Sequence, residues 1–231
     1  MYSLYRCAYS TVSKAKDLAL NFEDLKVSHF KDDTKLNLDL ELNNFFIEEL
    51  HKTDIPILSE ESFRFNTQGN RTYWLIDPLD GSLNYSNCNP TWGISLGLVL
   101  DGVLQFSVCY SNLHRAIYSC YKGKLYKNNR RLKIIIGNYL DNERVYYTGN
   151  PTGIEPIIDF ESHKKYKKVR QIGSALCSII TVVESGGSCL YEEKGIFIWD
   201  VWPAILIADS AGFSCTYLEL NDFRTHTKVD I

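Results

Sequence analysis

The stretch Trp74-Leu-Ile-Asp77-Pro78-Leu79-Asp80-Gly81-Ser82-Leu83-Asn84 places two carboxylates three residues apart at the end of an apolar run. Residues 73–76 predict a short buried strand, and Pro78 and Gly81 predict a turn that ends it. We therefore expect Asp77 and Asp80 to leave the strand on a rigid turn and to converge on one point. Two converging carboxylates repel each other unless a proton or a cation lies between them. A hard cation such as Mg²⁺ suits such a pair, and the carbonyl oxygen of Leu79 is a third candidate ligand.

The composition of the whole chain is that of an ordinary globular protein. Its 231 residues are 45% hydrophobic and 23% charged, which suffices for one large domain or two small ones. The net charge of −3 provides no general attraction to nucleic acid or to anionic membranes. The seven cysteines form no C-x-x-C pair, so they predict neither a zinc site nor a redox motif and fit buried free thiols in a reducing compartment. Because no apolar signal core or membrane-length run is present, we expect a cytoplasmic protein without a membrane partner.

The spacing of apolar residues predicts an α+β first part and an α/β second part. Asp101-Gly102 between two apolar runs is typical of a type I′ hairpin. Ser174 is a candidate helix N-cap, and Pro203 suits the first turn of a last helix. We expect helices over 1–30 (one or two), 38–50, 174–184 and 202–210, and strands over 56–58, 73–76, 92–100, 103–110, 116–120, 124–126, 145–148 and 189–191. These elements divide one compact unit into residues 1–130, with most of the acidic candidates, and residues 131–231.

Two further acidic sites stand out in the sequence. Glu60 and Glu61 follow the short apolar run 55–58, and such a pair is often only a solvated loop. Asp200 is bracketed by Trp199 and Trp202, which predicts a position near the core, where an unpaired charge is very costly. Asp200 is therefore a helix N-cap, a metal ligand, or both.

Taken together, four motifs resemble the inositol monophosphatase family of Mg²⁺-dependent, lithium-sensitive phosphomonoesterases. In order along the chain, they are Ser59-Glu60-Glu61-Ser62, Asp77-Pro-Leu-Asp-Gly-Ser-Leu-Asn-Tyr85, Gly173-Ser174-Ala175 and Trp199-Asp200. The resemblance covers about residues 30 to 215. It implies a layered αβαβα sandwich of the sugar-phosphatase type, a homodimer and a small phosphorylated substrate.

The resemblance also implies two to three Mg²⁺ ions in each active site. Glu60, Asp77 and the Leu79 carbonyl would hold the first ion. Asp77, Asp80 and Asp200 would hold the second, and Glu60 would contribute to a weaker third site. Such a set contains only oxygen ligands, as Mg²⁺ prefers.

Hydrolysis by metal-activated water is the implied chemistry, with Glu60, Asp77 and Asp80 as catalytic acids. Ser82 would orient the water with support from Asp39. Asp39 suits equally well the first turn of the helix predicted over 38–50, where an acid is favourable. Ser82 stands where the family more often has threonine; it keeps the hydroxyl and loses only a methyl group.

Substrate contacts are implied at three places. Backbone N–H groups at Gly81 and Ser82 would hold the phosphate, as helix N-termini do. Gly173, Ser174 and Ala175 would place donors near the substrate ring at another helix start. Glu193, seven residues before Asp200, matches the family's acid that contacts substrate hydroxyls, and its alternative is an exposed loop acid.

Our leading hypothesis is a Mg²⁺-dependent phosphomonoesterase acting on a small polyol phosphate, with myo-inositol monophosphate as the first candidate. Leu83-Asn84-Tyr85 after the Asp-Gly-Ser turn is closer to the inositol-phosphate branch than to the nucleotide branch. The alternatives are a fructose 1,6-bisphosphatase, a 3′-phosphonucleotide (pAp) phosphatase, or a non-enzymatic partner of RNA or transcription complexes. The shortened end, residues 216–231, would alter the substrate rim or a dimer contact.

The basic run from His163 to Arg170 is a solvated helix face, a surface that steers anionic substrates, or a site for RNA or a protein partner. The 15 tyrosines show no interleaved repeat, so we assign them to packing rather than to base stacking and expect no nucleic-acid ligand.

Overall fold

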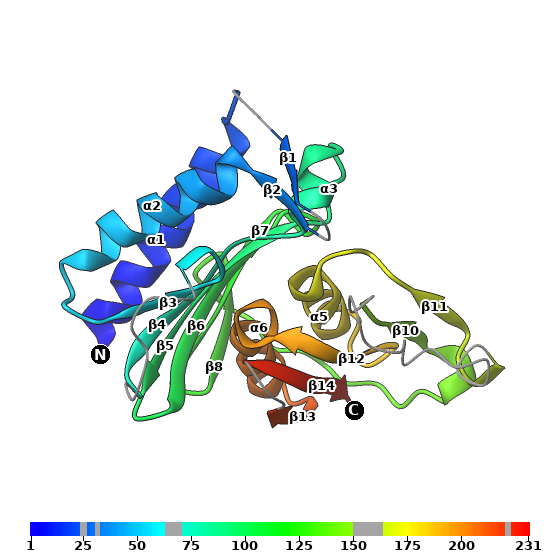
Figure 1. Cartoon of the computed structure of the whole chain (residues 1–231). Helices are drawn as coiled ribbons and strands as arrows, with labels where there is room; N and C mark the ends of the chain where they lie inside the picture. Colours follow the sequence, from blue (N-terminus) through cyan, green and yellow to red (C-terminus); the bar gives the residue numbers. More distant parts are fainter. Residues whose placement is uncertain (24–26, 31–32, 63–70, 150–163, 220–222) are drawn as a thin grey trace.

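Two long helices cover one face of a seven-stranded sheet in the computed structural model of the chain (Figure 1). The structure describes residues 1–23, 27–30, 33–62, 71–149, 164–219 and 223–231. Helix α1 (Tyr2–Leu20) buries residues at helical spacing, such as Ala8, Val12, Ala15 and Ala19. Helix α2 (Asn37–His51) confirms the helix predicted over 38–50 and packs beside α1 on the same face of the sheet.

Between α1 and α2 lies a small antiparallel hairpin of β1 (Val27–Phe30) and β2 (Asp33–Leu36). The prediction of helix through residue 30 was therefore wrong beyond Leu20. The reason is the sequence Val-Ser-His-Phe, in which apolar residues no longer follow helical spacing and can pair with the next strand.

The large sheet has the order β3-β4-β5-β6-β7-β8-β9, and it is antiparallel except for the parallel pair β3/β4. Its strands are β3 (Ile57–Ser59), β4 (Tyr73–Asp80), β5 (Gly93–Leu100), β6 (Val103–Ser111), β7 (Ala116–Tyr121), β8 (Lys124–Lys127) and β9 (Arg130–Arg131). The Asp101-Gly102 hairpin is confirmed, with φ of 51° and 80° at its two central residues, as a type I′ turn requires. A 3₁₀ helix (Glu60–Ser62) follows β3, and α3 (Ser82–Ser86) follows β4.

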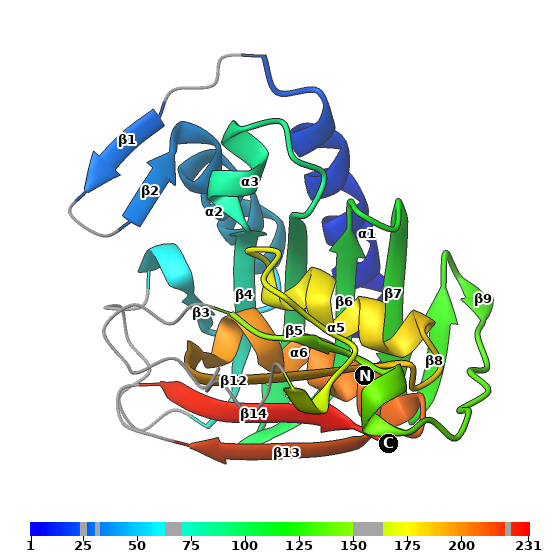
Figure 2. The same ribbon diagram turned by 90° about the vertical axis from the view of Figure 1, so that its right-hand side faces the viewer.

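Helices α5 (Ala175–Glu184) and α6 (Ile198–Ser210) lie against the other face of the large sheet (Figure 1). A five-stranded sheet of order β11-β10-β12-β14-β13 packs on these helices, and its strands run across those of the large sheet in Figure 2. Its strands are β10 (Val145–Tyr147), β11 (Lys168–Arg170), β12 (Cys189–Phe197), β13 (Ser214–Glu219) and β14 (Arg224–Asp230). The α+β sandwich is thus confirmed. The described residues form four layers in the order α, β, α, β, and the last helical layer of the predicted αβαβα order is not formed by them. The division at residue 130, which falls within β9, stays a prediction.

Helix α6 begins at Ile198, four residues earlier than predicted, so Pro203 lies inside the helix and not in its first turn. A proline at this position cannot donate to the carbonyl four residues before it. That carbonyl, on Trp199, instead accepts a hydrogen bond from the Ser95 hydroxyl at 3.1 Å. Asp200 lies in the first turn, and the N-cap is Phe197, so the N-cap alternative for Asp200 was wrong.

The basic run is not one helix face, because its residues 168–170 form the edge strand β11. His163 lies outside the described residues. All seven cysteines have free thiols, as predicted. None of the helices described in the structure is long and apolar enough to cross a membrane.

Candidate active site

Strand β4 continues through the Asp-Pro-Leu-Asp motif instead of ending before it. Asp77 pairs with Ser95 and Asp80 with Gly93, so two residues of β4 oppose one residue of β5 between these pairs. In a regular strand, residues three apart point to opposite faces, but one extra residue restores the same face. Pro78 is tolerated because a bulge does not need its missing N–H group. The predicted turn was therefore wrong, and a β-bulge brings the two aspartates together.

Three carboxylates converge at this bulge. Glu60 at the start of the 3₁₀ helix, Asp77 on β4 and Asp200 on α6 each place one oxygen within 4.8 Å of the others. Asp77 is fully buried; its Oδ1 accepts from the backbone N–H of Leu79 at 3.0 Å, while Oδ2 has no hydrogen-bond partner among the described residues. The sequence predicted all three residues, and the solvated-loop alternative does not describe Glu60.

The negative charges of the three carboxylates repel one another, and a bound positive charge would relieve this repulsion. Burial, followed by the charges of Glu60 and Asp200, holds the pKa of Asp77 well above its usual range. Burial and the charges of Glu60 and Asp80 do the same to the pKa of Asp200. An unpaired buried carboxylate oxygen facing two other carboxylates fits a hard divalent cation with oxygen ligands. The residues present therefore suit the Mg²⁺ that the resemblance implies.

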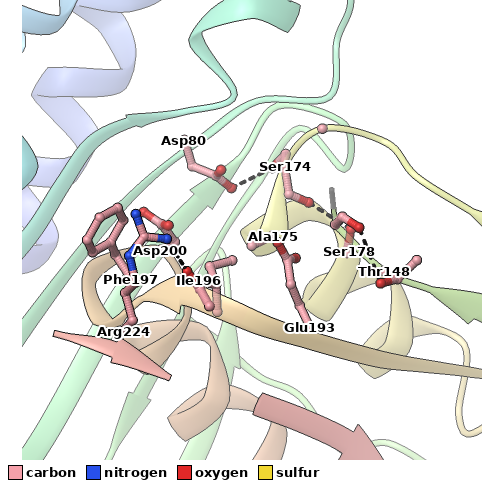
Figure 3. A pocket seen from close by; sticks show the side chains of 13 residues that line it. Asp80, Thr148, Ser174, Ala175, Ser178, Glu193, Ile196, Phe197, Asp200 and Arg224 are labelled. Atoms are coloured by element: carbon pink, nitrogen blue, oxygen red, sulfur yellow. Dashed lines mark hydrogen bonds between the residues drawn. The ribbon is translucent and has the colours of Figure 1, made fainter. Parts of the chain in front are cut away.

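Asp80 lies beside the cluster and binds the start of α5. Its Oδ2 accepts from the Ser174 hydroxyl at 2.5 Å and from the backbone N–H of Leu176 at 2.8 Å (Figure 3). Burial raises the pKa of Asp80 to about 6 in spite of these hydrogen bonds. Its assignment to a second metal ion stays a prediction.

Ser82 connects the opening motif to α2. Its hydroxyl has one hydrogen to donate, and two acceptors are within reach: Asp39 Oδ1 at 2.8 Å and the carbonyl oxygen of Leu79 at 3.0 Å. Asp39 is only 4% exposed and lies in the first turn of α2. The position of Asp39 fits both alternatives, because it lies in the first turn of α2 and also contacts the Ser82 hydroxyl.

Asn84 joins the motif to the loop before α5, a role that sequence reasoning missed. Its side-chain N–H donates to the carbonyls of Thr91 and Ile172 at 2.7 and 2.8 Å. Gly81 has a φ of 85°, and a Cβ there would lie 2.9 Å from the Thr91 carbonyl oxygen. Ser174 is the N-cap of α5, as predicted, and accepts from the backbone N–H of Cys177. Gly81, Gly173 and Ser174 are thus brought to one place.

A cavity of about 310 Å³ opens beside the carboxylates (Figure 3). Asp80, Gly173, Ser174, Ala175, Glu193 and Asp200 line it among the residues predicted from sequence. Glu193 is not a loop acid: it lies on β12, is 7% exposed, and accepts from the Tyr191 hydroxyl at 2.7 Å. Burial raises the pKa of Glu193 to about 7. A Cβ at Gly149 would collide with this carboxylate, so a larger residue there would displace the Glu193 side chain.

Arg224 on β14 is the one cation that lines this cavity among the described residues, and sequence reasoning missed it. It donates to the Gly195 carbonyl oxygen at 2.5 Å, and its guanidinium carbon lies 4.1 Å from the centroid of the Phe197 ring. Thr148 and Ser178 add hydroxyls to the wall. No sequence signal marks these residues, because they reach the cavity only through the pairing of β12 with β14 and the packing of α5.

The layered α+β fold carries a buried carboxylate cluster that suits divalent cations. A model of the inositol monophosphatase family matches residues 2–229, so the chain belongs to that family. The chain is similar to the Nus factor SuhB of Xylella fastidiosa, at 30% identity over 71% of this chain and 61% of that protein. It is also similar to human inositol monophosphatase 1, at 28% identity over 60% of this chain and 53% of that protein. The chain thus spans less than two thirds of the length of these curated relatives.

Solved structures share the fold. An inositol monophosphatase from Anabaena superposes with a TM-score of 0.80 at 23% identity, over 98% of this chain and 90% of that one. The Thermotoga maritima enzyme gives a TM-score of 0.79 at 21% identity, over 100% of this chain and 92% of that one.

Proposed function

We propose that the chain is a Mg²⁺-dependent phosphomonoesterase that hydrolyses a small polyol phosphate, with myo-inositol monophosphate as the first candidate. The observation that carries this function is the convergence of Glu60, Asp77 and Asp200, with one oxygen of each within 4.8 Å of the others. Glu60, Asp77, Asp200 and the Leu79 carbonyl would hold the cations, with Asp80 at the side. When bound, divalent cations would supply Lewis acidity toward phosphate oxygens and toward water.

The residues of the chain divide the remaining work. Asp39 orients the Ser82 hydroxyl, which in turn positions the attacking water. The backbone at Gly81 and Ser82 offers N–H groups to the phosphate. The first N–H groups of α5 already donate to Asp80 and Ser174, so that helix start contributes to the substrate ring through its position in the cavity wall. Glu193 faces the cavity as an acceptor for vicinal hydroxyls of a polyol, and Arg224 adds a positive charge for an anionic substrate. The homodimer implied by the family resemblance and the cytoplasmic location expected from the sequence stay predictions.

A phosphate-release assay tests the reaction and the substrate together. We expect release from myo-inositol monophosphate in Mg²⁺ and none in EDTA. Faster release from fructose 1,6-bisphosphate or from pAp would keep the chemistry and replace the substrate. Absence of release from all three esters in Mg²⁺ would contradict the enzymatic function. That outcome would favour the role of a transcription-complex partner, which the 30% identity to a Nus factor supports as a second candidate.

Removing the Ser82 hydroxyl should slow the reaction with little effect on substrate binding. For Ser82→Ala we expect kcat to fall about 100-fold, because the water loses its positioning group, while KM stays within about twofold. Asp39→Asn should lower kcat too, and the double variant should be no worse than Ser82→Ala alone, since the two residues act as one unit. Ser86→Ala in the same helix is the control, because the Ser86 hydroxyl donates to the Leu83 carbonyl and to no other group among the described residues. Additive losses in the double variant would separate the roles of Ser82 and Asp39.

A further inference from the structure

A second cavity of about 550 Å³ lies between the first half of α1 and strands β7 and β8, and it shares no lining residue with the cavity beside the carboxylates. We call it the tyrosine cleft. Five tyrosines make up most of its wall, with Tyr2, Tyr5 and Tyr9 from α1 and Tyr121 and Tyr126 from the sheet. Arg6, Ser10, Ser13 and Asn129 complete the lining, which contains no carboxylate among the described residues.

The tyrosine rings of the cleft pack against one another, and all of them except Tyr5 are at least partly exposed to solvent. Tyr5 is buried, its hydroxyl bonds Ser119 at 2.9 Å, and its ring stacks on Tyr121 with centroids 4.6 Å apart. Tyr2 is 58% exposed and lies 5.9 Å from Tyr121 between ring centroids. Tyr9, Tyr121 and Tyr126 are partly exposed. A planar group can therefore stack on rings that are already ordered, which keeps the entropy cost of binding low.

Cations stand on the same face of the sheet as these rings. The register pairs Tyr121 with Lys124 and Tyr126 with Arg131, and paired residues of antiparallel strands share a face. The Arg131 guanidinium carbon lies 5.7 Å from the centroid of the Tyr126 ring. Arg6 faces the cleft from α1. Lys127 points the other way, since it pairs with Glu184 at 2.7 Å.

The sequence around the cleft lacks acids altogether. Residues 102–140 contain no aspartate or glutamate, and neither do residues 1–16. Within the first range, six cations lie close together in the sequence: Lys122, Lys124, Lys127, Arg130, Arg131 and Lys133. Lys127 is paired with Glu184, so the other five carry the excess positive charge. A chain of net charge −3 therefore concentrates positive charge at the end of the molecule where β8 and β9 form the sheet edge (Figure 2). Such a local patch attracts anions although the protein as a whole is acidic.

We propose that the tyrosine cleft binds a nucleotide unit, with the base against the tyrosine rings and the phosphate near Arg6, Lys124 and Arg131. Ordered aromatic rings beside cations, with acids absent, match a ligand that is planar and anionic at once. The same chemistry is offered by a free nucleotide and by a single strand of nucleic acid. The assignment of the tyrosines to packing stays the alternative to this proposal, since Tyr2, Tyr5 and Tyr121 also pack on one another.

The test measures binding with the carboxylate cluster free of metal. Fluorescence anisotropy of labelled oligo-U and oligo-dT is followed in EDTA, with AMP as the competing mononucleotide. We expect Tyr2→Ala and Tyr121→Ala each to weaken binding roughly 5- to 100-fold. Arg6→Glu and Arg131→Glu should weaken binding and flatten its salt dependence. Displacement by AMP would identify a free nucleotide as a ligand, and binding of strands alone would identify single-stranded nucleic acid.

Matched controls separate the cleft from other surfaces. Tyr139→Ala and Lys52→Glu change an exposed tyrosine and a lysine outside the cleft and should leave binding unchanged. Unaltered melting temperatures show that Tyr2→Ala and Arg131→Glu, both at exposed positions, keep the fold. Two results would refute nucleotide binding at the cleft. One is a wild-type protein that binds neither probe, and the other is binding that excess inositol monophosphate abolishes while the cleft variants retain it. A change of molecular mass in the cleft variants would instead show an interface between two copies, which also refutes it.

Discussion

Asp77→Asn should abolish phosphate release and, at the same time, raise the melting temperature of the metal-free protein. Asp77 is fully buried, and its Oδ2 has no partner among the described residues while it faces Glu60 and Asp200. An asparagine oxygen can still accept from the Leu79 N–H group, and its side-chain NH₂ would replace Oδ2 and donate to the neighbouring carboxylates. One repulsive contact thus becomes an attractive one.

Opposite effects on activity and stability distinguish a functional cluster from a structural one. We expect kcat/KM to fall at least about 1000-fold, which corresponds to ~4 kcal/mol of lost transition-state stabilisation. The free energy of unfolding in EDTA should rise by about 1–2 kcal/mol, or roughly 2–6 °C in melting temperature. This gain should shrink toward pH 4, because the raised pKa of Asp77 then gives the wild-type side chain its own proton.

Differential scanning fluorimetry with and without Mg²⁺ reads both effects. Mg²⁺ should raise the melting temperature of the wild type and leave that of Asp77→Asn nearly unchanged. Asp209→Asn, an exposed change in the helix that carries Asp200, is the matched control and should behave as wild type. An Asp77→Asn protein that Mg²⁺ still stabilises fully would contradict the placement of the metal.

The candidate site was predictable from sequence wherever its residues lie in a short local motif. Asp77, Asp80, Ser82 and Gly81 follow one another along a few residues, so their proximity is a property of the chain itself. The bulge that turns Asp77 and Asp80 to one face was not predictable, because it depends on the register against β5. The same limit hid Arg224, which meets the cavity through strand pairing between β12 and β14.

Fold prediction succeeded and failed for related reasons. The Asp-Gly hairpin and the Ser174 cap are local rules, and both are confirmed. Helix α6 was predicted to begin too late because Pro203 normally marks a first turn. Ser95, from a distant strand, compensates the carbonyl that Pro203 leaves free, and no local pattern reports such a contact. A tertiary hydrogen bond thus supports the early start of α6, which local propensity placed wrongly.

Metal-free protein should lose stability as the pH rises from about 4 to 7, and Mg²⁺ should reverse that trend. Burial raises the pKa of Asp80 from 3.8 to about 6 and that of Glu193 from 4.5 to about 7. A carboxyl group whose pKa is higher in the folded state binds its proton more tightly there. Its contribution to stability is fully present below the unfolded pKa and is lost as the pH rises through the folded pKa. Bound Mg²⁺ favours the ionised cluster, so the loss should disappear when it is present.

Carboxylates with lowered pKa values affect the pH dependence of stability in the opposite direction, but they do so only at acidic pH. Glu49, Glu184 and Asp230 have partners that lower their pKa values, so their stabilisation is present above their unfolded pKa and lost only in acid. Between pH 5 and 7 these residues stay ionised. Burial lowers the pKa of His114, so this residue adds stability as the pH rises, and the measured slope is the loss from the buried carboxylic acids less this opposing contribution. A melting temperature in EDTA that stays flat or rises over this interval would contradict the raised pKa values.

Glu193→Gln assigns part of the slope to one residue. A glutamine can still accept from the Tyr191 hydroxyl, but it takes up no proton. The shift of the Glu193 pKa from 4.5 to about 7 corresponds to ~3 kcal/mol, or about 6–12 °C in melting temperature for a chain of this size. The variant in EDTA should therefore lose less stability than wild type between pH 5 and 7, and the two curves should approach each other at low pH. Parallel curves across the whole range would show that Glu193 is not the buried acid that the cavity geometry makes it.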